Sequence, residues 1–184
     1  MFGVLPAAAS AHAEISPRIA LSGQLQLFSL AVPTEKANAT TTKIVLTVPS
    51  GFSIDSFAPS PGWQRALRQS GSGDSATIQQ VTWAGGHVPT GEDALFQFLA
   101  TPSTSSTYRF TVQQTYSDGS VVDWAGAESS DAPAPTLQAK SSLGGGGTSA
   151  LSIVALIVGL LGLVAAGFAL VSGGSAGGGG RPLA

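Results

Sequence analysis

Short apolar runs separated by glycine- and proline-rich turns fill the middle of this chain, and they constrain its fold more than any other feature. In Lys43–Val48 every even-numbered residue is apolar, which is the two-residue period of a β-strand. Pro49-Ser50-Gly51 then breaks the run. Comparable runs recur about every ten residues between Glu14 and Leu137, without a convincing amphipathic helix.

These runs predict a set of short strands. The strands are expected at Gln24–Val32, Lys43–Val48, Phe52–Phe57, Trp63–Arg68, Thr77–Trp83, Ala94–Leu99, Tyr108–Tyr116 and Val121–Trp124. Strands of this length and spacing predict an all-β sandwich. Its core is expected to contain Phe28, Phe52, Phe57, Phe96, Phe98 and Phe110. Gly85-Gly86 is expected to end a strand before His87, and Asp118-Gly119 suits a type I′ turn in the last hairpin.

The two ends of the chain differ in composition from its middle. Residues 1–11 resemble the end of a secretory signal peptide without a basic start, so the leader is expected to begin upstream. A sandwich domain at 12–137 is followed by a Gly- and Ser-rich linker at 138–150. The 21 residues of 151–171 carry no charge and, at about 1.5 Å each, match a bilayer core of roughly 30 Å. We therefore expect one transmembrane helix there, a cytoplasmic tail at 172–184, and the sandwich on the outer side of the cell membrane.

The signal-peptide cut decides which residue begins the mature protein. Ala9 and Ala11 fit the −3 and −1 positions of a cleavage site, and a cut there makes His12 the first residue. Ala11 and Ala13 also fit, and a cut after Ala13 removes His12. The difference matters because the free amine and the imidazole Nδ1 of a leading histidine can chelate one metal ion.

Charge and cysteine content exclude several classes of function. Only 10% of the residues are charged and the net charge is −2, so there is no electrostatic basis for binding nucleic acid. The chain has no cysteine, which excludes disulfides, thiolate zinc sites, iron–sulfur clusters and cysteine nucleophiles. Metal binding would therefore depend on histidine and carboxylate ligands.

His12 is the residue around which a metal site can be built. Two nitrogens and a carboxylate in one plane suit Cu(II), which prefers tetragonal N and O donors. The candidate carboxylates are Asp123, Glu14, Asp118 and Glu128. His87 is the other imidazole and lies in an expected loop, from which it would supply a second histidine ligand. On pattern alone, Trp124 is a core residue and Asp123 a solvated one, because neighbours in a regular strand point to opposite faces.

Several motifs taken together resemble one family. They are Ala11-His12, Ile15-Ser16-Pro17, Val32-Pro33-Thr34-Glu35-Lys36, Thr41-Thr42-Lys43-Ile44, Pro61-Gly62-Trp63, Thr82-Trp83 and Gln114–Trp124. From His12 to about Thr136 the chain resembles the YcnI-like copper-binding domain family. The resemblance implies an exported Ig- or cupredoxin-like sandwich that binds Cu(II) through a mono-histidine brace. Carried over, it implies His12 as amine and imidazole ligand, Asp123 as carboxylate ligand and Trp124 as the neighbouring indole. Glu14 and His87 stay further candidate ligands on their residue types alone.

The sequence thus predicts a membrane-anchored, extracytoplasmic Cu(II)-binding protein that is not an enzyme. We expect a copper metallochaperone or copper-acquisition accessory, whose partners are the copper ion, the membrane and a copper transporter or chaperone, but no nucleic acid. Two alternatives stay open. One is a metal-free adhesion or structural sandwich in which His12 and Trp124 are incidental, and the other is a copper-dependent oxidase that uses His87.

Overall fold

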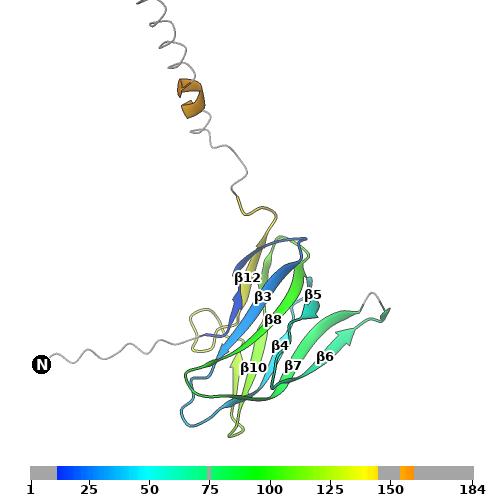
Figure 1. The fold of residues 1–184 in the computed structure, drawn as a ribbon, viewed down its shortest axis with the longest axis vertical. Helices are drawn as coiled ribbons and strands as arrows, with labels where there is room; N and C mark the ends of the chain where they lie inside the picture. Colours follow the sequence, from blue (N-terminus) through cyan, green and yellow to red (C-terminus); the bar gives the residue numbers. More distant parts are fainter. Residues whose placement is uncertain (1–11, 74–75, 145–153, 160–184) are drawn as a thin grey trace, which may run out of the picture. The chain divides into compact units, whose positions relative to one another are not determined.

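The protein has two compact units, and the strands that the structure describes lie in one of them. The computed structural model describes residues 12–73, 76–144 and 154–159 (Figure 1). The units are Met1–Leu143 and Gly144–Ala184, and the twelve strands of the described residues belong to the first. The predicted all-β class is therefore confirmed.

One layer is a four-stranded antiparallel sheet in the order β1-β3-β8-β5. Its strands are β1 (Glu14–Ser16), β3 (Gln26–Pro33), β8 (Asp93–Pro102) and β5 (Phe52–Phe57). Alternate residues of β8 are buried, because successive side chains of a strand point to opposite faces. The pairs Phe28↔Phe98 and Leu30↔Phe96 place the apolar rows of β3 and β8 side by side in the core.

The second layer is a five-stranded antiparallel sheet in the order β11-β10-β4-β7-β6. Its strands are β11 (Val121–Trp124), β10 (Thr111–Tyr116), β4 (Thr41–Thr47), β7 (Thr77–Val88) and β6 (Gln64–Ser70). β10 lies between β11 and β4, so its inward side chains reach both neighbours.

A small third sheet closes one side of the sandwich. It consists of β2 (Ile19–Leu21), β12 (Thr136–Lys140) and β9 (Thr107–Arg109). The single strand predicted at Tyr108–Tyr116 is wrong, because the chain changes sheets at Phe110, whose N–H donates to Pro135 O. The alternation of buried and exposed residues continues through Phe110, so the pattern gave no sign of the change. β12 continues to Lys140, three residues beyond the predicted end of the domain at 137.

The expected break at Gly85-Gly86 is also wrong, because β7 continues to Val88 and includes His87. The register between β4 and β7 shifts there, from Lys43↔Ala84 to Thr41↔Val88. Gly85 has a φ of 89°, and a Cβ on Gly86 would lie 2.1 Å from the Trp63 ring. These glycines therefore allow a bulge and a close aromatic contact within the strand.

Aromatic rings fill the space between the two layers. The Phe52 ring lies 5.0 Å from Phe110, 5.2 Å from Phe28 and 5.7 Å from Tyr108 by centroid. A second group stacks Trp83 on Phe96 at 4.2 Å. Of the six phenylalanines predicted for the core, Phe57 is partly buried and the others are buried, so that prediction is confirmed.

The last hairpin uses a different turn from the predicted one. A type I′ turn needs positive φ at both central residues, but in Asp118-Gly119 only Gly119 has it, at 82°. Gly119 N–H donates to Tyr116 O, and Tyr116 N–H donates to Ser120 O. This is a type I turn followed by a glycine bulge, which the same dipeptide also suits.

In the C-terminal unit the described helical residues are 154–159. No helix among the described residues has the length and apolar character needed to cross a membrane. Most of the predicted transmembrane segment at 151–171 lies outside the described residues, as do the predicted leader at 1–11 and tail at 172–184.

Candidate functional site

His12 lies at the start of the sandwich, two residues before the first residue of β1. Ala13 and Ile15 are buried in the core, so His12 and Glu14 point outward by the alternation of an extended chain. The His12 ring nevertheless contacts the core, because its centroid lies 6.5 Å from that of Trp124 in an edge-to-face arrangement. The structure therefore brings together two residues that are more than a hundred positions apart.

Trp124 is the last residue of β11 and is held by a buried hydrogen-bond network. Its side chain is only 2% exposed, and its Nε1–H donates to Gln114 Oε1 over 2.9 Å. Gln114 Nε2 donates in turn to Pro33 O at 2.8 Å and Thr41 Oγ1 at 2.7 Å. Each polar atom of the Gln114 amide thus has a partner, which matters because an unpaired polar group inside a protein is costly. The network fixes the position of the indole that His12 contacts.

A surface hollow of about 430 Å³ opens beside His12. Its walls include the acidic residues Glu14 and Glu128 and the basic residues Arg18 and Arg109. Arg18 forms an ion pair with Glu14. In the described part of the chain no ion pair or hydrogen bond engages the Glu128 carboxylate, so it is the acidic group of the hollow that is open to a ligand.

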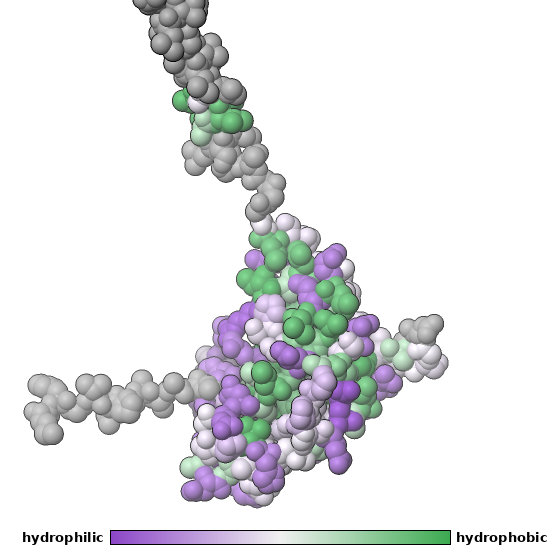
Figure 2. Space-filling model, viewed as in Figure 1, coloured by the Kyte–Doolittle hydropathy of each residue, from purple (hydrophilic) through white to green (hydrophobic). Residues whose placement is uncertain are grey.

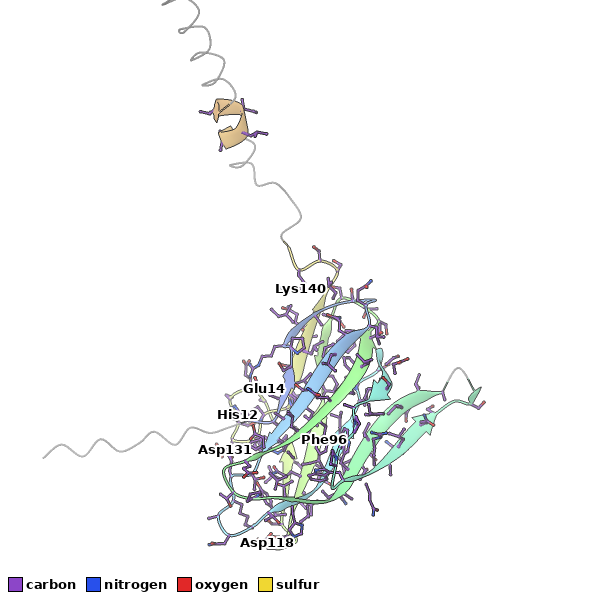
Figure 3. All side chains as sticks on the ribbon, viewed as in Figure 1. His12, Glu14, Phe96, Asp118, Asp131 and Lys140 are labelled. Carbon is purple, nitrogen blue, oxygen red and sulfur yellow. The ribbon has the colours of Figure 1, made fainter. Side chains whose placement is uncertain are left out.

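The segment between β11 and β12 forms the wall that carries Glu128. Arg109 Nη2 donates to the carbonyls of Ala125 and Gly126, and Gly126 N–H donates to Ala132 O over 2.9 Å. A Cβ on Gly126 would lie 2.1 Å from Ser130 Oγ and 2.9 Å from Ala132 O, so only glycine fits without movement. These hydrogen bonds hold the loop that forms the wall in one conformation. Figure 3 places Asp131 of this loop on the same flank of the domain as His12 and Glu14.

Asp123 lies on the other side of β11. Its register partner is Gln113, whose Nε2 donates to Asp123 Oδ1 over 3.0 Å, and both side chains are exposed. Trp124 is buried, as expected for the next residue of a regular strand. The structure therefore does not bring the Asp123 carboxylate to His12, and its role as a metal ligand stays a prediction.

His87 and Asp118 are also remote from His12. His87 is on β7, three strands from β11 in the sheet order, which corresponds to about 14 Å at about 4.8 Å per strand. Asp118 lies in the β10–β11 turn and forms an ion pair with Lys36. That pair, together with hydrogen bonds from Ser120, holds the pKa of Asp118 well below the usual carboxyl range. Neither residue lines the hollow.

The donor atoms around His12 fit a Cu(II) ion in one particular way. Among the described residues no group of three or more His, Cys, Asp and Glu side chains is placed to hold a metal. A site here would therefore need one residue to supply two donors, as a leading histidine does with its amine and imidazole. Glu128 would add the oxygen donor that Cu(II) accepts, and Glu14 is the second candidate for this role.

The sequence analysis did not identify the residues that support Trp124 and the loop between β11 and β12. Gln114 was one polar residue in an exposed-looking run, and only its place between β11 and β4 makes it buried. Arg109 precedes the change of sheet at Phe110, which the pattern concealed. The available signal was Gly126 followed by Pro133 and Pro135, since glycine and proline are typical of ordered turns as well as of linkers.

Comparison with known proteins gives three results. The family model described as a domain of unknown function, DUF1775, matches residues 12–139. The copper-binding protein CutI of Bacillus subtilis (strain 168) is 33% identical over 130 residues, which are 69% of this chain and 61% of that protein. This chain thus spans less than two thirds of that curated relative.

The third result concerns the fold. The crystal structure of an uncharacterized protein from Nocardia farcinica, described as having an immunoglobulin-like fold, aligns with a TM-score of 0.58 at 31% identity. The alignment covers 70% of this chain and 97% of that one. The sandwich is therefore immunoglobulin-like.

Proposed function

Because the chain belongs to the YcnI-like family of DUF1775 domains, whose member CutI is a copper-binding protein, we propose that it binds Cu(II) at the His12 hollow. The observation that carries the proposal is the position of His12, which contacts the buried Trp124 and shares a hollow with Glu128. In a mature chain that begins at His12, the amine and imidazole form the brace.

Two residues, Asp123 and Glu128, are candidates for the carboxylate ligand of the site. The family resemblance implies Asp123, which is on the opposite side of β11 and bonded to Gln113. The hollow itself offers Glu128, which faces the same space as His12. We propose Glu128 as the oxygen ligand, because its side chain lines the hollow that contains His12. The Asp123 side chain could reach that hollow only if β11 turned its outer face inward.

We further propose that the domain works outside the cell membrane as a copper chaperone or copper-acquisition accessory. The uncharged stretch Leu151–Val171 supports a membrane anchor by its length and apolar character. The small residues before His12 support export and processing. The hollow brings one histidine, His12, to its wall, and this favours binding over turnover.

The experiment compares two forms of the protein in a Cu(II) titration followed by calorimetry and electron paramagnetic resonance. One begins at His12 with a free amine, and the other is the same chain with that amine acetylated, so that only the amine donor is lost. We expect one equivalent of tight binding in the first form and a large loss of affinity with a changed spectrum in the second. Equal affinity and identical spectra would overturn the brace.

His12→Ala and His87→Ala are the matched side-chain variants. We expect loss of binding only in the first, because His87 is about 14 Å from β11. Loss only in the second would move the site to β7. Sequencing the N-terminus of protein exported by its host tests the cut, since a start at Glu14 would remove the ligand.

A further inference from the structure

Four chain segments meet at one end of the sandwich, which we name the leucine end. They are residues 22–27, 49–53, 99–106 and 138–143. Ser22 N–H donates to Lys140 O over 2.9 Å, Gly23 N–H to Pro102 O over 2.7 Å, and Ser103 N–H to Gly51 O over 2.8 Å. These bonds make the leucine end a single ordered surface.

Exposed leucines gather at this end. Leu25 is 54% exposed, Leu27 55%, Leu99 36% and Leu143 55%. Leu27 pairs directly with Leu99 on the outer face of β3 and β8. Figure 2 shows hydrophobic side chains collected where β12 ends, at the top of the domain. Apolar side chains grouped on a surface typically mark an interaction site.

Charge is distributed unequally between the two ends. Within the described segments of the leucine end, Lys140 is the charged residue. The opposite end is joined by Thr34 N–H donating to Glu92 O and Ser117 N–H donating to Thr40 O. Its loops carry Glu35, Lys36, Glu92 and Asp118, and Asp93 begins β8 there. One end is thus apolar and weakly basic, and the other is acidic.

We propose that the leucine end docks on the surface of a lipid bilayer. The proposal rests on the membrane anchor of the proposed function, because ten residues separate Lys140 from Leu151 and span at most about 36 Å. A domain tethered this closely meets the bilayer repeatedly, and the leucine end is the surface that gains by leaving water. An anionic bilayer also repels the acidic end.

Docking in this orientation keeps the copper hollow in water. Glu14, two residues after His12, pairs with Ala31, which lies four residues along β3 from Leu27, or about 13 Å. The hollow is on the flank of the domain and away from the leucines. A partner that delivers or accepts copper would therefore reach His12 beside the membrane without displacing lipid.

The test uses the absence of cysteine in the full chain, which permits single fluorescent labels. Leu25→Cys and Ser50→Cys place an environment-sensitive dye at the leucine end, and Glu92→Cys places it at the acidic end. Each protein is reconstituted in phosphatidylcholine–phosphatidylglycerol vesicles that contain a nitroxide-labelled lipid. We expect shorter-wavelength emission and nitroxide quenching at positions 25 and 50, but neither at position 92. Equal behaviour of all three labels would overturn the proposal.

Leucine variants supply the matched control. Replacing Leu25 and Leu99 by serine should reduce the quenching at position 50, whereas Leu95→Ser should leave it unchanged. Leu95 is 57% exposed on the same sheet face but pairs with Ala31, away from the leucine end. Equal losses in both variants would contradict docking through this end.

Flotation separates failure of the anchor from failure of the docking surface. Protein that does not float with vesicles would refute the anchor in the proposed function. Protein that floats without lipid quenching at position 25 would refute only the docking. A wavelength shift that needs high protein concentration and no lipid would identify a second copy of the chain as the occupant, and would also overturn the proposal.

Discussion

Asp123 and Trp124 are adjacent in the sequence but belong to two differently built regions. On the inner side of β11, Trp124 is buried, bonded to Gln114 and in contact with His12. On the outer side, Asp123 and Gln113 form an exposed pair in water. The comparison teaches that Asp123 is not close to His12 merely because it precedes Trp124 in the sequence. Successive side chains of a strand point to opposite faces of the sheet.

The largest effect is expected from Trp124→Ala. Removing a buried indole should lower the free energy of unfolding by about 3–5 kcal/mol. Asp123→Ala, one residue earlier and exposed, should change it by no more than about 0.5 kcal/mol. Urea denaturation of both variants measures the contrast. Similar losses of unfolding free energy would contradict the assignment of Trp124 to a buried face and of Asp123 to an exposed face of β11.

A smaller effect is expected from Gln114→Leu. The change leaves the Trp124 indole N–H without its buried acceptor, which should cost about 1–3 kcal/mol of unfolding free energy. Gln113→Leu on the outer side should be close to neutral. The ¹⁵N–¹H resonance of the Trp124 indole should move in the first variant alone, and an unchanged resonance would refute the network.

The smallest effect is expected at the exposed Lys36–Asp118 pair. The pKa of Asp118 is lowered in the folded state, so its contribution to stability is present above the ordinary carboxyl pKa of about 3.9 and fades as the pH falls below it. Asp118→Asn should therefore lower Tm slightly at pH 7 and progressively less below pH 4. A difference that grows on acidification would contradict the assigned direction.

The sequence predicted much of the sandwich and only part of the site. Periodicity located Phe52–Phe57 and Val121–Trp124 correctly because a half-buried strand alternates. It failed at Phe110, where the alternation continues while the chain changes sheets, and at Gly85, where glycine makes a bulge. These features depend on partner strands, which a local pattern does not contain.

For the site, the pairing of His12 with Trp124 was anticipated through family resemblance, and the structure brings the two rings together. The sequence had no means to choose among the carboxylates, because the choice depends on which residues face one hollow. Gln114 and Arg109 act through contacts with β11 and the β11–β12 loop. Such supporting residues become visible only when the strand order is known.

The most direct test of the central claim is the Cu(II) affinity of Glu128→Gln against that of Asp123→Asn, in chains that begin at His12. Both changes remove one carboxylate charge and keep the side-chain shape. We predict that Glu128→Gln weakens binding at least about tenfold, or about 1.4 kcal/mol, and that Asp123→Asn leaves it nearly unchanged. The reverse order would place the copper ligand on the outer side of β11 and contradict the account.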